Sequence, residues 1–135
     1  DFKGTSTGIS CTDVAMSIDE FGKLANDIYN KEDEGEISEI RQKFYDNFRL
    51  AGHIRVLISA NKLIKDRAGH MELTLAACIL AGIPPAITMS EMANPHAALC
   101  LTQDEAKETA EKLVLPFIKT EEIIEAFTNS EHYKE

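Results

Sequence analysis

The chain has 135 residues, 44% hydrophobic and 27% charged, which is the composition of one ordinary globular domain and excludes a chain that is disordered throughout. Its 14 basic and 23 acidic residues give a formal net charge of −9 without any run of Lys and Arg, so neither a nucleic-acid partner nor docking on an anionic membrane is expected. Three cysteines without a CxxC spacing favour a reducing, cytoplasmic location. The apolar stretches are too short to span a bilayer, so no membrane segment is expected.

The first third of the chain predicts a loop followed by a helix. Residues 1–10 (DFKGTSTGIS) are rich in Gly and hydroxyl side chains, which is typical of a strand end that runs into a loop. Residues 17–20 (SIDE) match a capping box, and apolar residues with helical spacing follow, so a helix is predicted over about residues 18–29. The charged connector 30–36 is expected to be a solvated surface loop, and residues 37–44 to add one or two helical turns.

The rest of the chain alternates between predicted strands and helices. Short apolar segments predict strands over residues 54–59, 86–89 and 115–118. Helical patterns with capping signals at Gly82, Thr102 and Thr120 predict helices over residues 71–81, 103–113 and 121–127. This interleaving, without internal repeats, predicts an α+β fold with a layered mixed β-sheet and helices packed on both faces.

The densest polar cluster is Asp66–Glu72 (DRAGHME), where a polar loop meets a predicted buried helix. A helix N-terminus attracts anions, Arg67 can pair with a phosphate in a bidentate manner, and Gly69 allows close approach, so the segment would make a phosphate seat. His70 could bind a metal or carry a proton. The alternative is a helix N-terminus with ordinary capping charges. A zinc deaminase is excluded, because the HxE pattern has no accompanying CxxC.

Two further residues are candidates for chemistry. His53 follows Gly52 at the start of the predicted strand 54–59, and Glu91 follows the predicted strand 86–89, where layered α/β folds place their sites. For each of them the residues alone leave an alternative open: a structural histidine and a surface glutamate.

Five motifs stand in a specific order. They are Gly4–Ser10 (GTSTGIS) with Asp13, Ala51–His53 (AGH), Arg67–Glu72 (RAGHME), Gly82–Ala86 (GIPPA) and Ser90–Met92 (SEM). In this order, over about residues 4–127, the chain resembles the 3,4-dihydroxy-2-butanone 4-phosphate synthase family, which carries TTTGIS…D, PGH, RxGHTE, AGL.PA and CEM. RxGHxE alone is modestly specific, whereas the motifs in register are a strong signal.

The resemblance implies a lyase of riboflavin biosynthesis that converts D-ribulose 5-phosphate to L-3,4-dihydroxy-2-butanone 4-phosphate and formate with Mg²⁺ or Mn²⁺. By resemblance, His53 and Glu91 would form the catalytic acid–base pair, and His70 would bind a metal ion. The substrate and its phosphate would be held by Arg67, Gly69, Met71, Thr7 and Asp13. Enolisation beside a carbonyl needs a base and a proton return, and a divalent cation stabilises the enediolate. The family also implies a homodimer whose subunits share active sites.

Four positions depart from the family pattern. Met71 stands for a Thr, Ala51 for a Pro, Ser90 for a Cys and Val14 for an Arg, which predicts a divergent member that keeps the proposed catalytic groups. Residues 1–135 are expected to be the C-terminal part of one synthase-like domain, since the family carries an acidic metal-binding loop in an N-terminal half. No turnover is therefore predicted for this chain alone. The alternatives are a non-catalytic paralogue that keeps the phosphate site and a generic binding domain, and the motif order tells against the latter.

Overall fold

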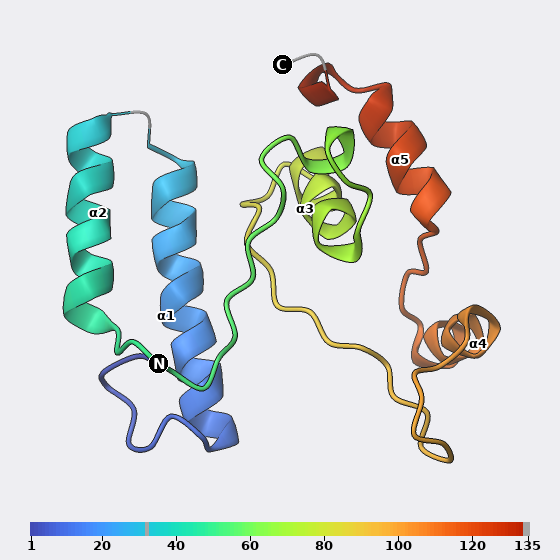
Figure 1. The fold of residues 1–135 in the computed structure, drawn as a ribbon, viewed down its shortest axis with the longest axis horizontal. Coiled ribbons are helices and arrows are strands. Elements are labelled where there is room, and N and C mark those ends of the chain that lie inside the picture. Colours follow the sequence, from blue (N-terminus) through green and yellow to red (C-terminus); the bar gives the residue numbers. More distant parts are fainter. Residues whose placement is uncertain (32, 134–135) are drawn as a thin grey trace. The chain divides into compact units, whose positions relative to one another are not determined.

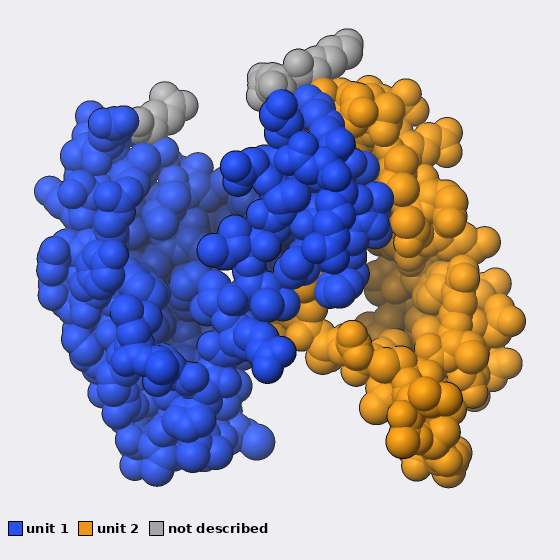
Figure 2. All heavy atoms as spheres, viewed as in Figure 1, with its two compact units in different colours: residues 1–87 blue, residues 88–135 orange. Residues whose placement is uncertain are grey.

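The computed structural model describes residues 1–31 and 33–133, and the chain divides into two compact units, residues 1–87 and 88–135 (Figure 2). Unit 1 contains α1 (Cys11–Tyr29), α2 (Glu34–Asn47), the short 3-10 helix η1 (Leu63–Lys65) and α3 (His70–Leu80) (Figure 1). Unit 2 contains α4 (Gln103–Leu113), α5 (Thr120–Thr128) and the 3-10 helix η2 (Glu131–Tyr133). Among the described residues, no helix combines the length and the apolar character that a membrane crossing requires.

The predicted α+β fold with a layered mixed β-sheet is wrong. The described residues form helices and irregular segments, with isolated β-bridges at Phe2–Phe48 and Ala93–Cys100 in place of strands. Segments 54–59, 86–89 and 115–118, predicted as strands, have no regular secondary structure, and Ile58 on the first of them is 86% exposed. A strand needs a neighbour that takes up its backbone N–H and C=O groups, and the described residues supply no such neighbour here. In these segments an apolar pattern without a partner therefore gave irregular backbone and no strand.

Helix α1 begins at Cys11, earlier than the predicted residue 18. Ser10 caps it, because its hydroxyl accepts a hydrogen bond from the backbone N–H of Asp13 at 3.1 Å. Ser17, the predicted cap, lies inside the helix, where its hydroxyl donates to the Asp13 carbonyl oxygen at 2.9 Å. Both serines satisfy the sequence rule for a cap, and the earlier one starts the helix.

Helix α2 is longer than the one or two turns predicted. Asp33 caps it, since its carboxylate accepts from the backbone N–H groups of Gly35 and Glu36. Of the connector predicted over residues 30–36, residue 32 lies outside the described residues, and residues 34–36 form the first turn of α2.

The three remaining predicted helices are confirmed. Helix α3 ends in a Schellman motif at Gly82, whose φ is +67°, with hydrogen bonds of 3.0 Å from Gly82 N–H to the Ile79 carbonyl and from Ile83 N–H to the Cys78 carbonyl. Helix α4 begins with the predicted capping box at Thr102. Helix α5 starts one residue earlier than predicted, so Lys119 and not Thr120 occupies its cap position.

An aromatic cluster joins α1 to α2. The rings of Phe44 and Phe48 stack with centroids 5.1 Å apart, and Phe21 from α1 meets both of them edge-on at 6.3 and 6.2 Å. Phe2 meets Phe48 edge-on at 5.9 Å, so the start of the chain packs against the residue that follows α2. Each aromatic pair of this kind contributes about 0.5–1.5 kcal/mol beyond the burial of its area.

A short antiparallel pairing extends this contact. The backbone N–H of Lys3 donates to the Asn47 carbonyl at 2.7 Å, and the backbone N–H of Arg49 donates to the Asp1 carbonyl at 2.8 Å. Residues 1–3 are thereby aligned with residues 47–49, which brings loop 1–10 beside the segment that leads to His53.

Loop 1–10 is held by the carboxylate of Asp13, from the first turn of α1. The backbone N–H groups of Ser6, Thr7 and Gly8 donate to it at 3.3, 3.1 and 3.0 Å, and the Thr7 hydroxyl donates at 3.2 Å. Burial alone would raise the pKa of Asp13, but hydrogen bonds from Gly8, Ser6 and Thr7 together hold it below its ordinary value. The loop therefore depends on the ionised carboxylate.

Replacing Asp13 by Asn is expected to destabilise unit 1 at neutral pH, because Asn places an NH₂ where the loop requires an acceptor. In the wild-type protein the folded-state pKa lies below the ordinary value of 3.8, so the stability from ionisation is complete above that value and is lost as the pH falls through the lower folded-state pKa. The difference in free energy of unfolding between wild type and Asp13→Asn should therefore shrink in acid. Urea unfolding at neutral pH and below pH 3.8 measures it.

The matched control is Asp19→Asn on the same helix, where the side chain is 68% exposed and pairs with Lys23 at the surface. It should change stability little at either pH. A difference for Asp13→Asn that stayed constant across this pH range would contradict a role for its charge.

Candidate functional site

The predicted site residues fall into three groups. Thr7, Asp13 and His53 gather around loop 1–10 in unit 1. Arg67, Gly69, His70 and Met71 lie at the start of α3, also in unit 1. Glu91 belongs to unit 2.

Around loop 1–10 the surface forms an open hollow of about 530 Å³, within the size range of small-molecule sites. Thr7 and His53, two predicted site residues, both line it. Asp13 supports this wall, because its carboxylate accepts hydrogen bonds from both the backbone and the hydroxyl of Thr7. Loop 1–10 and the segment after α2 therefore bring together residues that are about 45 positions apart in the sequence.

His53 is bound to the carboxylate of Asp1. Its ring Nδ1 lies 2.7 Å from Asp1 Oδ2, and its backbone N–H donates to Asp1 Oδ1 at 2.8 Å. The Asp1 side chain is 5% exposed, whereas that of His53 is 49% exposed. The imidazole is thus held from the protein side and remains accessible to solvent and to a ligand.

Two cations border the same hollow. The Lys3 ammonium donates to the carbonyl oxygens of Tyr45 and Asp46 at 3.0 and 2.8 Å, in the last turn of α2. The Arg49 guanidinium donates to the Thr5 hydroxyl at 2.8 Å. Within the described part of the chain neither cation forms a carboxylate ion pair, so both leave positive charge at the hollow in a protein whose net charge is −9.

At the start of α3, the carboxylate of Glu72 is 1% exposed. The backbone N–H of Ala60 donates to its Oε1 at 3.0 Å, and this hydrogen bond holds the pKa of Glu72 below its ordinary value, although burial acts in the opposite direction and Arg67 assists. Among the described residues its Oε2 finds no hydrogen-bond partner, and it lies 3.9 Å from Arg67 Nε. A Cβ at Gly69 would come within 2.6 Å of Glu72 Oε2 and 2.9 Å of Arg67 Nε, so a larger residue here would require one of these two side chains to shift.

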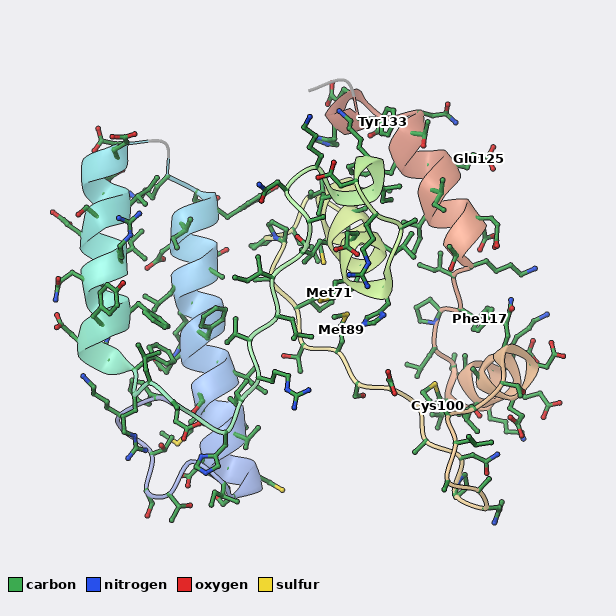
Figure 3. The ribbon with its side chains drawn as sticks, in the orientation of Figure 1. Met71, Met89, Cys100, Phe117, Glu125 and Tyr133 are labelled. Atoms are coloured by element: carbon green, nitrogen blue, oxygen red, sulfur yellow. The ribbon has the colours of Figure 1, made fainter. Side chains whose placement is uncertain are left out.

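The predicted phosphate site combines a positive and a negative side chain in this structure. Arg67 is 62% exposed and can reach a ligand with its guanidinium, while Glu72 places a negative charge beneath it. Met71 lies at the first turn of α3, half-buried (Figure 3), and supplies its backbone N–H but no hydroxyl. An anion seated here would therefore rely on Arg67 and on backbone N–H groups.

The predicted metal ligand, His70, is the exposed first residue of α3. Divalent magnesium and manganese favour several oxygen or nitrogen donors around one point. Among residues 1–31 and 33–133, no group of three or more His, Cys, Asp or Glu side chains comes together in that way. The described residues therefore do not fit a complete metal centre, and His70 as a ligand stays a prediction.

Glu91 is exposed and accepts a hydrogen bond from the thiol of Cys100 at 3.2 Å. This contact raises the pKa of the Cys100 thiol, because the neighbouring carboxylate disfavours a thiolate. The acid–base role of Glu91 stays a prediction.

Sequence reasoning missed Asp1, Lys3, Arg49 and the burial of Glu72. Asp1 and His53 are separated by 52 positions, and no local pattern joins them. The detectable signal for Glu72 was its place at the start of an otherwise apolar segment, MELTLAACILA, whose helix buries Leu73, Ala76 and Cys78. A carboxylate on that face had to be buried and paired.

The chain is similar in sequence to proteins of one known family. The family profile described as 3,4-dihydroxy-2-butanone 4-phosphate synthase matches residues 1–126. A protein of that name from Archaeoglobus fulgidus is 33% identical over 93% of this chain and 49% of its own length. Namesakes from Methanosarcina mazei and Methanothermobacter thermautotrophicus are 30% and 28% identical over 93% and 91% of this chain.

The chain spans about half the length of these relatives, 47% to 49% of each. The match nevertheless covers loop 1–10, both groups of predicted site residues in unit 1, and Glu91 in unit 2. The expected resemblance is therefore confirmed, and this chain belongs to the 3,4-dihydroxy-2-butanone 4-phosphate synthase family.

Proposed function

We propose that the protein containing this chain is a lyase of riboflavin biosynthesis, which converts D-ribulose 5-phosphate to L-3,4-dihydroxy-2-butanone 4-phosphate and formate. The observation that carries the proposal is the family match over residues 1–126, which includes every residue to which a role is assigned below. The hollow beside loop 1–10 supports it, because an accessible imidazole, a threonine hydroxyl and two cations meet there.

The proposed roles follow from the chemistry of each group. His53 and Glu91 act as acid and base in the enolisation steps, for which an imidazole and a carboxylate have suitable proton affinities. Arg67, Gly69 and the backbone of Met71 bind the phosphate at the start of α3. Thr7 contacts the sugar from loop 1–10, and Asp13 contributes by holding that loop.

Dependence on Mg²⁺ or Mn²⁺ and a homodimer with shared active sites are parts of the same proposal. Since the described residues do not make a metal centre, His70 would need carboxylate ligands from elsewhere in the protein or from a second subunit. When bound, the cation would stabilise negative charge on an enediolate. Apart from His70, none of the residues assigned a role here is proposed to bind that cation.

A non-catalytic relative that keeps the phosphate site is the second candidate. Met71 favours it, because the family's hydroxyl donor to the phosphate is replaced by a thioether. Such a protein would bind sugar phosphates and release no formate.

The direct test measures formate release from D-ribulose 5-phosphate with Mg²⁺, for a full-length protein that contains this chain and for the chain alone. We expect release by the former that EDTA abolishes, and none by the latter, because the described residues hold an incomplete set of metal donors. A folded full-length protein that binds ribulose 5-phosphate without releasing formate would favour the second candidate.

His53→Ala and Glu91→Ala are each expected to abolish formate release by that full-length protein, a loss of at least about 10²-fold, because a general acid or base typically contributes about 10²- to 10⁴-fold. Both side chains are exposed, so the circular dichroism spectrum and thermal midpoint should be retained. His96→Ala, at an exposed histidine without an assigned role, is the matched control and should keep full activity. Full activity in either His53→Ala or Glu91→Ala would remove that assignment.

Arg67→Ala should chiefly raise KM for ribulose 5-phosphate. The loss of a charge-assisted pair costs about 1.5–3 kcal/mol, which corresponds to roughly a 10- to 150-fold change in affinity. Arg67→Lys keeps the charge but loses the bidentate guanidinium, so its KM should lie between those of the wild type and Arg67→Ala. Arg55→Ala, another exposed arginine in unit 1, is the control. An unchanged KM for Arg67→Ala would count against the phosphate seat at α3.

A further inference from the structure

The carboxylate of Asp1 meets His53 with both of its oxygens. Oδ2 lies 2.7 Å from the ring Nδ1, and Oδ1 accepts the backbone N–H of the same residue at 2.8 Å. We propose that Asp1 is the positioning residue of the active site, fixing the ring orientation and the Nδ1–H tautomer of His53 so that Nε2 exchanges the proton with substrate. This proposal rests on the proposed function, in which His53 is an acid–base residue.

The tautomer follows from the donor and acceptor capacities of the two groups. A carboxylate accepts hydrogen bonds and donates none, so a ring nitrogen at 2.7 Å from it must carry the proton. This holds for the neutral and the protonated imidazole alike. Nε2 is then the ring atom that gains and loses a proton. The second hydrogen bond, from the backbone N–H of His53, holds the carboxylate by its other oxygen.

The packing around Asp1 leaves its carboxylate little freedom. Its side chain is 5% exposed, and its backbone is aligned with Arg49 by a hydrogen bond of 2.8 Å. Two glycines complete the enclosure: a Cβ at Gly8 would overlap Asp1 Oδ2 and come within 3.0 Å of His53 Nδ1, and a Cβ at Gly52 would overlap the Asp1 backbone and approach Oδ1 to 2.9 Å. Two motifs that are remote in the sequence, TSTGIS and AGH, therefore each supply a glycine to one contact.

The same arrangement explains why the imidazole can act. His53 is 49% exposed and lines the hollow with Thr7, while its partner is enclosed. A buried acceptor behind an accessible imidazole orients the ring and stabilises the imidazolium that forms when Nε2 takes a proton.

The first experiment replaces Asp1 by Asn and reads the tautomer of His53 by long-range ¹H–¹⁵N NMR. The backbone N–H of His53 requires an acceptor at the Oδ1 position, so the Asn oxygen should turn there and its NH₂ should face the ring. An NH₂ can bond only an unprotonated Nδ1, so the ring should change from the Nδ1–H to the Nε2–H tautomer. Asp19→Asn, at an exposed position of α1, should leave the His53 signals unchanged.

The second experiment measures formate release by the full-length protein with Asp1→Asn. We expect kcat to fall about 10²- to 10⁴-fold, because Nε2 of His53 would carry a proton in this variant and could no longer act as a base. KM should change much less, because no contact with the substrate is removed. Asp1→Glu, which restores a carboxylate, should recover part of kcat.

A pair of glycine variants tests the same contact without altering its charges. Gly52→Ala should displace Asp1 and lower kcat, because its Cβ would overlap the Asp1 backbone. Gly22→Ala, on α1 with nothing within 4 Å of the added Cβ, should leave kcat unchanged. This pair keeps the proposal testable if Asp1→Asn fails to fold.

The outcomes separate this proposal from the function on which it rests. An unchanged His53 tautomer in Asp1→Asn would overturn the proposal, and so would a changed tautomer with undiminished kcat. If the wild-type full-length protein released no formate, the proposed function would fail, and the NMR comparison would still decide whether Asp1 sets the tautomer.

Discussion

The candidate site around loop 1–10 depends on one buried carboxylate, that of Asp13. A loop has no regular backbone hydrogen bonding of its own, so its backbone N–H groups need an acceptor from another part of the chain. Asp13 supplies that acceptor from the first turn of α1, and the same residue's backbone N–H is bound by the Ser10 cap. The start of α1 and the conformation of loop 1–10 therefore depend on the same residue, and Asp13 fixes the positions of Thr7 and Gly8.

Local signals in the sequence predicted local structure well. Gly82 was expected to end a helix, and it does so because the left-handed backbone there costs glycine little and completes two hydrogen bonds to the α3 carbonyls. Thr102 was expected to begin one, and its hydroxyl and Glu105 form the reciprocal pair. Such interactions join residues a few positions apart, so a short stretch of sequence contains both partners. The start of α1 was misplaced because Ser10 and Ser17 each satisfied the rule.

Interactions between remote residues could not be predicted in this way. Ile54–Ser59 has the pattern of a strand, but strand formation depends on a neighbouring chain segment, and that neighbour is absent from the described residues. The same limit applies to the site: the motifs named His53, Arg67 and Glu91, whereas the contact of Asp1 with His53 required the pairing of residues 1–3 with 47–49. The motif order identified the family, because family membership depends on sequence and not on which partners are present.

Both groups of site residues in unit 1 share one electrostatic design. In each group a carboxylate is enclosed and accepts a backbone N–H, and a basic side chain lies on its outer side. The side chain of Asp1 is 5% exposed and that of its partner His53 49%. The side chain of Glu72 is 1% exposed and that of its neighbour Arg67 62%. Both sites therefore expose a positive or proton-accepting group, although the protein carries a net charge of −9. The charge exposed at the surface governs which ligands are attracted to a site. In each pair the carboxylate is the enclosed member and the basic side chain is the exposed one. An acidic protein can in this way present a basic group to a negatively charged ligand, since the local charge at the surface is set by which member of each pair is exposed.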